Sequence, residues 1–266
     1  MWYSPNAPAI GRAAFDEGQV KALRQVLDEA VPYMCKTGHY ANSISYPRLI
    51  SAGRPDLFKK AFQVFIESNA HEFGASVFPD GYCFLLEYCA LRRHDPDVLG
   101  SHLQIHFDAN FLGTTAPVYN VWVTLDDVGD GAPGLSFLDP RLDIGLLRDA
   151  WYREQKQAVA ERGDQAGLSL MYDADGVAEV FGKPIEQVLF SPRVKAGDFI
   201  AFHQCVAHAT EVVVGPARRR RSIEFRIASV TALPKRLRSP DSQLGVCRTA
   251  ADGSRSIEFV GAGKFT

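Results

Sequence analysis

The sequence lacks the long hydrophobic run that a membrane-spanning helix needs. No apolar stretch reaches about eighteen residues, the shortest length that crosses a bilayer as a helix. It also lacks an excess of charge of either sign, because 29 basic and 31 acidic residues leave a formal net charge of −2. Nucleic-acid-binding domains usually carry a marked basic excess. We therefore expect neither a membrane nor a nucleic acid as partner, and a small molecule remains the expected ligand.

Paired cysteines and a secretion signal are absent as well. The five cysteines are widely spaced and contain no CxxC pair. An odd number at such spacing favours reduced thiols over a disulfide framework. The first residues, Met1 to Asn6, show no basic region followed by an apolar run, so no signal peptide is expected. These absences together predict a cytoplasmic protein.

The composition that remains is that of an ordinary globular protein. Hydrophobic residues make up 46% of the chain and charged residues 23%. A length of 266 residues suits one large domain. We expect a single domain over 1–266, with a helical N-terminal part at 1–80, a barrel at 81–230 and a C-terminal tail at 231–266.

Two segments of the N-terminal part carry apolar side chains at helical spacing. Residues 18–31 form one such stripe, and Pro32 ends it. Residues 56–70 form another, with Phe58 and Phe62 on one face. Both segments are predicted to be helices that pack against a core.

Beyond Tyr82 the pattern changes to short β-rich runs separated by Gly, Pro and Asp. We expect strands near 82–92, 103–109, 118–126, 134–138, 189–195, 198–203, 208–214 and 220–230, with a further strand at 257–260 in the tail. This series predicts a mainly β fold with flanking helices, in the form of a double-stranded β-helix, the jelly roll or cupin-like barrel.

One segment interrupts the series of strands. Residues 142–183 contain a helix-like stretch and are longer than a routine connection between strands. Such an insertion serves either as a lid or substrate wall over a site, or as a helical buttress on the barrel exterior. The sequence favours neither alternative.

The candidate metal ligands lie at the ends of predicted strands. His106 and Asp108 are two residues apart in a predicted strand, where residues i and i+2 share a face. His208 follows the predicted strand at 198–203. Two histidines and one carboxylate with open positions opposite are the ligand set of non-haem Fe(II) oxygenases. His203 is the rival third ligand, and we expect a structural role for it.

An arginine run, Arg218 to Arg221, follows His208 and leads into the predicted strand at 220–230. A guanidinium there can hold the far carboxylate of 2-oxoglutarate by a two-pronged hydrogen bond. Alternation along the strand puts Arg220 on the face of Ser222, and Arg219 with Arg221 on the other face. A solvated edge and a general anion patch are the alternatives.

These motifs together resemble the phytanoyl-CoA dioxygenase-like family of Fe(II)/2-oxoglutarate-dependent oxygenases. The resemblance extends over roughly 80–230. The segments that carry it are His106-Phe107-Asp108, the predicted strand at 119–127, and Gly197 to His203 running into His208-Ala209-Thr210 with the arginines behind.

The resemblance implies a role for each matching residue. It implies that His106, Asp108 and His208 bind the iron and form the catalytic centre. It places an aromatic residue, Trp122, beside the keto acid, a small hydroxyl residue at Thr210, and the carboxylate-binding arginine at Arg219.

The implied activity is the hydroxylation, or another oxidation, of a small organic molecule. The cofactors are Fe(II), 2-oxoglutarate as co-substrate and O2, and 2-oxoglutarate is converted to succinate and CO2. Desaturation, cyclisation and epoxidation use the same ligand set and stay open, as do the substrate and the oligomeric state. The alternatives from other classes are a non-redox cupin-like barrel that binds a metal or a sugar, and a metal-free interaction module.

Overall fold

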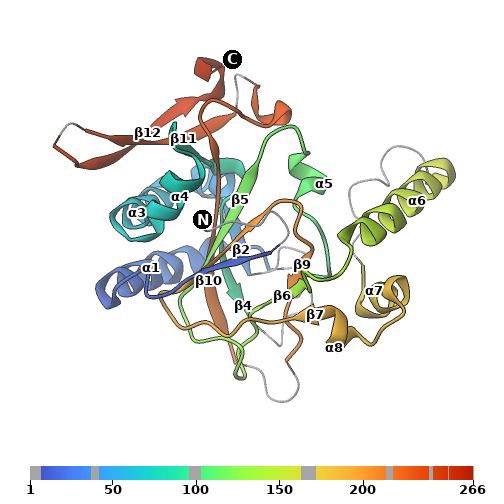
Figure 1. The fold of residues 1–266 in the computed structure, drawn as a ribbon. Coiled ribbons are helices and arrows are strands. Elements are labelled where there is room, and N and C mark those ends of the chain that lie inside the picture. The colour runs from blue at the N-terminus through green and yellow to red at the C-terminus, as the bar shows by residue number, and fades with distance from the viewer. Residues whose placement is uncertain are drawn as a thin grey trace.

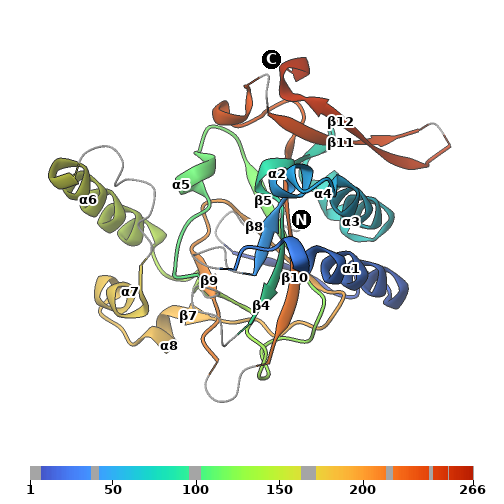
Figure 2. The ribbon, with the colours of Figure 1, turned by 180° about the vertical axis from the view of Figure 1, so that it is seen from behind.

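Antiparallel strands form the centre of the molecule, and helices lie on both sides of them (Figures 1 and 2). The computed structural model describes residues 7–36, 42–95, 103–162, 172–213, 218–239, 242–250 and 252–265. The strands are β1 (Ala9–Gly11), β2 (Ser43–Ser45), β3 (Tyr82–Leu85), β4 (Ala90–His94), β5 (Val118–Thr124), β6 (Leu135–Leu138), β7 (Leu189–Phe190), β8 (Phe199–His203), β9 (His208–Thr210), β10 (Arg220–Ser229), β11 (Gln243–Thr249) and β12 (Arg255–Gly261).

The strands of the described residues belong to two sheets. The larger is nine-stranded, in the order β1-β8-β5-β10-β3-β11-β12, with β4 also paired to β10 and β2 to β4. The smaller has the order β7-β6-β9. One cavity is lined by residues of β5 and β10 from the larger sheet and of β9 from the smaller, so the site described below lies between them. The predicted mainly β, jelly-roll fold is confirmed.

The helices are α1 (Glu17–Ala30), α2 (Tyr46–Ser51), α3 (Pro55–Glu67), α4 (Ala70–Val77), α5 (Ala109–Leu112), α6 (Ile144–Arg162), α7 (Ala174–Phe181) and α8 (Ile185–Val188). Short 3-10 turns occur at Val31–Tyr33, Leu86–Tyr88, Lys235–Leu237 and Ala262–Phe265. Helix α1 begins at a capping box, in which Asp16 accepts from the backbone of Gln19 at 2.8 Å and the Gln19 side chain accepts from the backbone of Asp16 at 3.0 Å. Both N-terminal helices expected from the sequence are present. Among the described residues, none of the helices combines the length and the apolarity needed to cross a bilayer.

The main hydrophobic core lies between the larger sheet and helices α1 and α3. The ring of Phe62 packs 4.7 Å from that of Phe84 on β3, and Phe65 packs 4.7 Å from Phe225 on β10. All four side chains are fully buried. Close aromatic pairs of this kind add to the free energy gained by burying apolar area. The helical layer therefore holds one face of the sheet rigidly and leaves the other face for the site.

The strand predicted over 103–109 is not a regular strand. Ile105 and His106 form only isolated bridges, to Tyr172 and His208. Asp108 has helical dihedral angles (φ −61°, ψ −26°) and precedes α5, whose Leu112 N–H donates to the Asp108 carbonyl at 3.0 Å. The extended chain thus turns into a helix at Asp108. The prediction was wrong because the start of α5 ends the extended segment there, although the local sequence pattern is typical of a strand.

Several strand boundaries differ from the predicted ones. In the run at 189–195 only β7 is a strand, and Val194 adds an isolated bridge to Val128. In the described part of the run at 208–214 only β9 is a strand. The tail contains β11 as well as the expected β12, and the two form an antiparallel hairpin on β3. Strands β1 and β2 were not expected, since each is only three residues long.

The insertion at 142–183 carries α6 and α7, and with α8, which follows it, these helices lie on the side of the sheets opposite to α1 and α3 (Figures 1 and 2). Leu147, Tyr172 and Val177 pack in one buried cluster with Ile105 and Phe107. The insertion therefore contacts the segment that carries His106 and Asp108, a contact that both a lid and a buttress would make.

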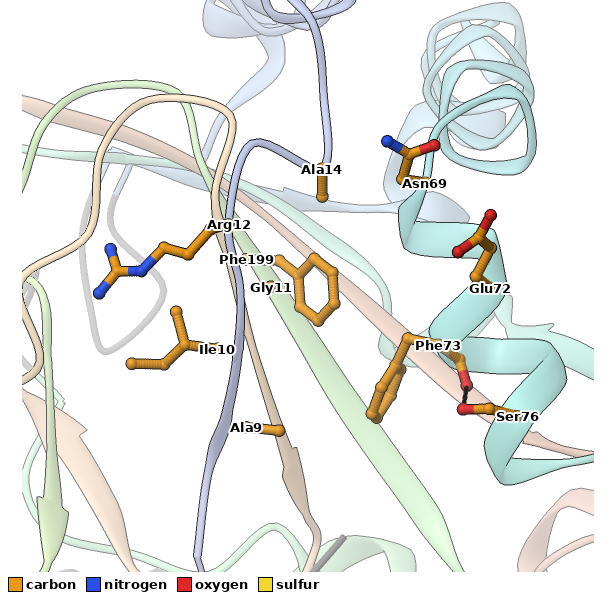
Figure 3. A pocket seen from close by; sticks show the side chains of 10 residues that line it. All are labelled: Ala9, Ile10, Gly11, Arg12, Ala14, Asn69, Glu72, Phe73, Ser76 and Phe199. Carbon is orange, nitrogen blue, oxygen red and sulfur yellow. Dashed lines mark hydrogen bonds between the residues drawn. The ribbon is translucent and has the colours of Figure 1, made fainter. Parts of the chain in front are cut away.

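A second cavity, of about 490 Å³, lies between β1 and α4 (Figure 3). Phe73 and Phe199 form much of its wall, and Glu72 and Arg12 lie at its edge. Gly11 lets β1 cross directly over the Phe199 ring, since a Cβ there would overlap that ring. None of the residues that line this cavity lines the one between the two sheets.

Candidate metal centre

A backbone bridge brings the two candidate histidine ligands together. The N–H of His106 donates to the carbonyl of His208 at 3.0 Å, and the N–H of His208 donates to the carbonyl of His106 at 3.0 Å. Their ring centroids lie 4.3 Å apart. Two residues distant in sequence are thus held side by side by main-chain hydrogen bonds alone.

Both imidazoles are held in the tautomer that suits a metal. His106 Nδ1 lies 2.7 Å from the Gln104 carbonyl, and His208 Nδ1 lies 3.0 Å from the Val206 carbonyl. A carbonyl oxygen only accepts, so each Nδ1 carries the proton and each Nε2 keeps its lone pair. Metal-binding histidines commonly donate their other ring N–H in this way.

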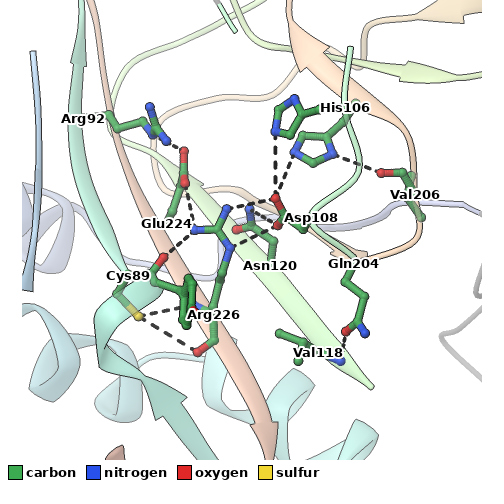
Figure 4. A network of polar contacts seen from close by, with 12 residues as sticks. Cys89, Arg92, His106, Asp108, Val118, Asn120, Gln204, Val206, Glu224 and Arg226 are labelled. Atoms are coloured by element: carbon green, nitrogen blue, oxygen red, sulfur yellow. Dashed lines mark hydrogen bonds and ion pairs between the residues drawn. The ribbon is translucent and has the colours of Figure 1, made fainter. Parts of the chain in front are cut away.

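Asp108 completes the group (Figure 4). Its Oδ1 lies 3.9 Å from His106 Nε2 and 3.8 Å from His208 Nε2. The three ligand atoms lie within 4.8 Å of one another. Among the described residues, this is the one group of three such side chains close enough to share a metal ion. The Asp108 residue is 1% exposed. The geometry is that of three donors that can share one metal ion.

Burial sets the protonation of this group. It lowers the pKa of both histidines, that of His208 to about 4 with the nearby His106 as the next cause. Burial, the largest single cause, acts to raise the pKa of Asp108, but the charge and hydrogen bonds of Arg226 together with the two nearby histidines outweigh it, and the pKa is lowered. At neutral pH the group therefore offers two neutral nitrogens and one anionic oxygen, the protonation states that bind metal.

A second part of the cavity is formed by Arg220 and Trp122. Arg220 is 3% exposed, and its guanidinium carbon lies 5.1 Å from the centre of the Trp122 ring. It donates to the carbonyls of Pro133 at 2.9 Å and Gly134 at 3.1 Å, and no described carboxylate pairs with it. Burial, and then the charge of Arg92, lowers its pKa. A buried cation without a carboxylate partner is a site for an anion.

The Asn120 Oδ1 acceptor that lines the cavity has no hydrogen-bond partner among the described residues, and neither do three buried groups around Arg220 that can donate. They are Arg220 Nε, Trp122 Nε1 and Ser222 Oγ, which we call the donor cluster. Arg220 and Ser222 lie on one face of β10, and Trp122 lies on the neighbouring strand β5. Each can donate a hydrogen bond, and a buried donor left unpaired costs about 1–3 kcal/mol. The donor cluster therefore points to a ligand with acceptor atoms.

The residues expected beside the keto acid are partly placed in this cavity. Trp122 and Thr210 line it, and the Thr210 hydroxyl oxygen accepts from the Leu103 N–H at 3.0 Å. Arg219 does not line it. The Arg219 side chain is 67% exposed, and its Nε pairs with Asp95 at 3.0 Å.

The structure therefore does not bring Arg219 into the cavity, whereas its neighbour Arg220 lines it, and the identity of the arginine that binds the keto acid stays a prediction. Consecutive residues of an extended chain point in opposite directions, so only Arg220 reaches the cavity. The signal was available in the sequence, because Arg220 alternates with Ser222 on one face.

Among the described residues, the other histidines are not part of the group. His203 Nδ1 accepts from the backbone N–H of Cys205 at 3.3 Å, and its ring lies 5.4 Å from that of Tyr119. His39 and His102 lie outside the described residues.

Sequence reasoning did not find four polar residues that line the same cavity. They are Arg92, Asn120, Glu224 and Arg226. The available signal was the polar series 220, 222, 224 and 226 in a strand whose other residues are mostly apolar.

Solved structures share this architecture. The epimerase SnoN from nogalamycin biosynthesis, in complex with Fe3+, alpha ketoglutarate and nogalamycin RO, is 13% identical with a TM-score of 0.57, over 87% of this chain and 82% of SnoN. EctD from S. alaskensis, with 2-oxoglutarate and 5-hydroxyectoine, is 12% identical with a TM-score of 0.57, over 87% and 75%. HygX from Streptomyces hygroscopicus, with nickel and 2-oxoglutarate, is 13% identical with a TM-score of 0.53, over 98% and 96%.

This chain has their fold. No protein-family model matches the sequence, and no curated protein matches it significantly. At these identities the likeness establishes the architecture, and the activity has to be argued from the chain's own residues.

Proposed function

We propose that the protein is an Fe(II)/2-oxoglutarate-dependent dioxygenase that hydroxylates, or otherwise oxidises, a small organic molecule. The observation that carries the proposal is that two members of the His106, Asp108 and His208 group line the same cavity as the buried cation Arg220. Each feature by itself also occurs in proteins of other classes. Together they match the two needs of this chemistry, a metal with open positions and a site for a dicarboxylate.

The residues present fit the metal. His106, Asp108 and His208 would hold Fe(II), since two neutral imidazoles and one carboxylate are the ligand set used for it. When bound, the iron and 2-oxoglutarate supply the oxidising chemistry, in which O2 is consumed and succinate and CO2 are released. SnoN, EctD and HygX have been solved with the keto acid, two of them with a metal, on the same fold.

The residues present also fit the co-substrate. Three arginines line the cavity, Arg92, Arg220 and Arg226, and among the described residues Glu224 is the one carboxylate that lines it. With Asp108, which pairs with Arg226, two carboxylates stand against three arginines, so one positive charge is left over. Both Arg92 and Arg226 pair with a carboxylate, and Arg220 does not. The far carboxylate of 2-oxoglutarate would supply the missing anionic partner of Arg220 and accept hydrogen bonds from the donor cluster. Arginine binds a carboxylate well through two parallel, charge-assisted hydrogen bonds.

The chain's own side chains would orient and shield the reactants. The ring of Phe202 packs 4.4 Å from that of His208, and Leu135 also lines the cavity, so apolar side chains cover part of the metal side. The indole of Trp122 lies against the Arg220 guanidinium and limits its rotation. Thr210 would add a hydroxyl beside the keto acid.

The finer assignments rest on sequence motifs. We place the chain in the phytanoyl-CoA dioxygenase-like family, treat 1–266 as a single domain and expect it in the cytoplasm. Hydroxylation is the leading reaction. Epimerisation and ring closure are attributed by name to two proteins of this fold, SnoN and SnoK, so the fold does not separate these outcomes.

The direct test is a spectrum. Fe(II) and 2-oxoglutarate added to the protein without oxygen should give the weak visible charge-transfer band of a chelated keto acid, and Asp108→Ala should not give it. Loss of the band without added Fe(II) is the control. If the wild-type protein gives no band and releases no succinate, the non-redox metal- or sugar-binding barrel becomes the better account.

A further inference from the structure

The carboxylate of Asp108 is held on a second side by Arg226. Arg226 Nε donates to Oδ2 at 3.1 Å and Nη2 donates to Oδ1 at 3.1 Å, a two-pronged pair. The side chains are 7% and 1% exposed. Asn120 Nδ2 lies 3.5 Å from Oδ2. Oδ1 faces the two histidine Nε2 atoms, while Oδ2 is turned away from them.

Arg226 is in turn held by a series of alternating charges (Figure 4). Its Nη1 donates to Glu224 Oε2 at 3.2 Å and to the Tyr88 carbonyl. The other oxygen of Glu224 pairs with Arg92 on the adjacent strand β4. We call Arg92, Glu224, Arg226 and Asp108 the charge series. Each carboxylate and guanidinium of the series has a partner of opposite sign.

Burial makes this series rigid. A charge taken out of water is tolerated only when a partner of good geometry compensates it, and removing one partner is strongly destabilising. Arg226 can therefore not swing away from Asp108 and Glu224 without leaving both uncompensated. The plane of the Asp108 carboxylate is fixed by the same contacts.

We propose that Arg226 is a positioning residue that presents Asp108 to the metal through one oxygen, with Glu224 and Arg92 holding Arg226 in place. The inference rests on the proposed function of Asp108 as a metal ligand. Because the guanidinium occupies Oδ2 and one lone pair of Oδ1, the remaining lone pair of Oδ1 is the one directed between the histidines. A ligand limited to one oxygen leaves more positions open for the keto acid and O2.

The same strand offers a matched control. Arg221 makes an equivalent fork with Asp126, with Nη2 to Oδ1 at 2.8 Å and Nε to Oδ2 at 3.2 Å. This pair lies on the opposite face of β10, away from the cavity, and is more exposed, at 29% and 22%. Loss of the Arg221–Asp126 pair should change only the stability of the fold and leave metal binding unchanged.

The experiment is a titration of the full-length protein with Co(II), without 2-oxoglutarate or oxygen. Arg226→Lys keeps the charge and removes the fork. It should weaken Co(II) binding by roughly 10- to 100-fold, the usual effect of losing a partner that orients a metal ligand. The visible spectrum of the bound Co(II) should change as well. Arg221→Lys should leave the affinity and the spectrum at their wild-type values.

Glu224→Gln keeps the shape of the side chain and touches neither a metal ligand nor the metal. It should shift the Co(II) spectrum in the same direction as Arg226→Lys, with a smaller loss of affinity. If thermal melting shows that Arg226→Lys does not fold, this variant decides the question. If the Co(II) spectrum changes in Arg226→Lys but not in Glu224→Gln, the role of Glu224 in holding Arg226 is overturned, while the positioning role of Arg226 stands.

The outcomes separate the two proposals. A wild-type protein that does not bind Co(II) overturns the proposed metal site itself. If the wild type binds Co(II) and both variants match it in affinity and spectrum, the positioning role is overturned while the metal site stands. Tighter binding by Arg226→Lys also overturns it, since the arginine would then compete with the metal for Asp108.

Discussion

The two faces of strand β10 are both buried, but they carry opposite chemistry. The outer face has Ile223, Phe225 and Ile227, which pack beneath the N-terminal helices. The inner face has Arg220, Ser222, Glu224 and Arg226, which reach the cavity or the strands around it. In most half-buried strands polarity follows exposure to water. Here it follows the division between what holds the fold and what binds the ligands.

The difference has an energetic reason. Burying a large apolar side chain contributes about 1.5–3 kcal/mol, so the outer face stabilises the sheet. Buried polar groups cost free energy unless they are paired. The charge series is paired within itself, whereas Arg220 Nε and the rest of the donor cluster lack acceptors among the described residues. Substitutions on the two faces should therefore have separable consequences.

The largest effect is expected at the metal ligands. Asp108→Ala removes the anionic donor, and turnover and bound iron should both be lost, as in His106→Ala and His208→Ala. The measurement is the iron content together with succinate release that depends on 2-oxoglutarate.

His203→Ala is the control for that series, because its ring lies outside the group. It should keep nearly all its iron. If His203→Ala loses the metal and His208→Ala retains it, the third ligand has been misassigned.

The next effect belongs to the outer face. Phe225→Ala opens a cavity against Phe65 and Phe84, so the free energy of unfolding should fall by about 3–5 kcal/mol. The affinity of the folded protein for 2-oxoglutarate should stay at its wild-type value. Urea denaturation and a co-substrate titration measure the two. A large loss of affinity in this variant would break the separation of the faces.

A smaller effect is expected within the donor cluster. Trp122→Phe keeps the ring and removes the indole N–H, and a single hydrogen bond contributes about 1 kcal/mol, which is roughly a fivefold change in affinity. The 2-oxoglutarate constant should rise by that factor, and Ser222→Ala should act similarly. Unchanged constants in both variants would mean that the cluster does not contact the keto acid.

The sequence predicted those features that depend on local pattern. The apolar stripes located α1 and α3, because an amphipathic period is preserved when a helix packs on a core. The jelly-roll class followed from the spacing of β runs. The grouping of His106, Asp108 and His208 was predicted through their motif, although the reason given, a regular strand over 103–109, was wrong.

The features that the sequence did not reveal depend on contacts between distant segments. Asp108, which directly precedes α5, pairs with Arg226 in β10. The two residues are far apart in the sequence, so no local pattern predicts the pair. Whether Arg219 or Arg220 faces the cavity depends on the register of β10, because a shift of one residue turns every side chain to the opposite face of the sheet. Strand β11 was hidden because its hairpin with β12 is partly exposed and polar, with an ion pair between Arg248 and Glu258.

The most direct test of the account is a titration of 2-oxoglutarate into Fe(II)-loaded Arg220→Ala and Arg219→Ala. Losing one partner of a buried charged pair costs on the order of 2–5 kcal/mol. At about 1.4 kcal/mol per tenfold, Arg220→Ala should raise the 2-oxoglutarate constant roughly thirty-fold to several thousand-fold while keeping its iron. Arg219→Ala should change it by a few-fold at most, because an exposed ion pair contributes little. A large rise in Arg219→Ala, or none in either variant, would contradict the account.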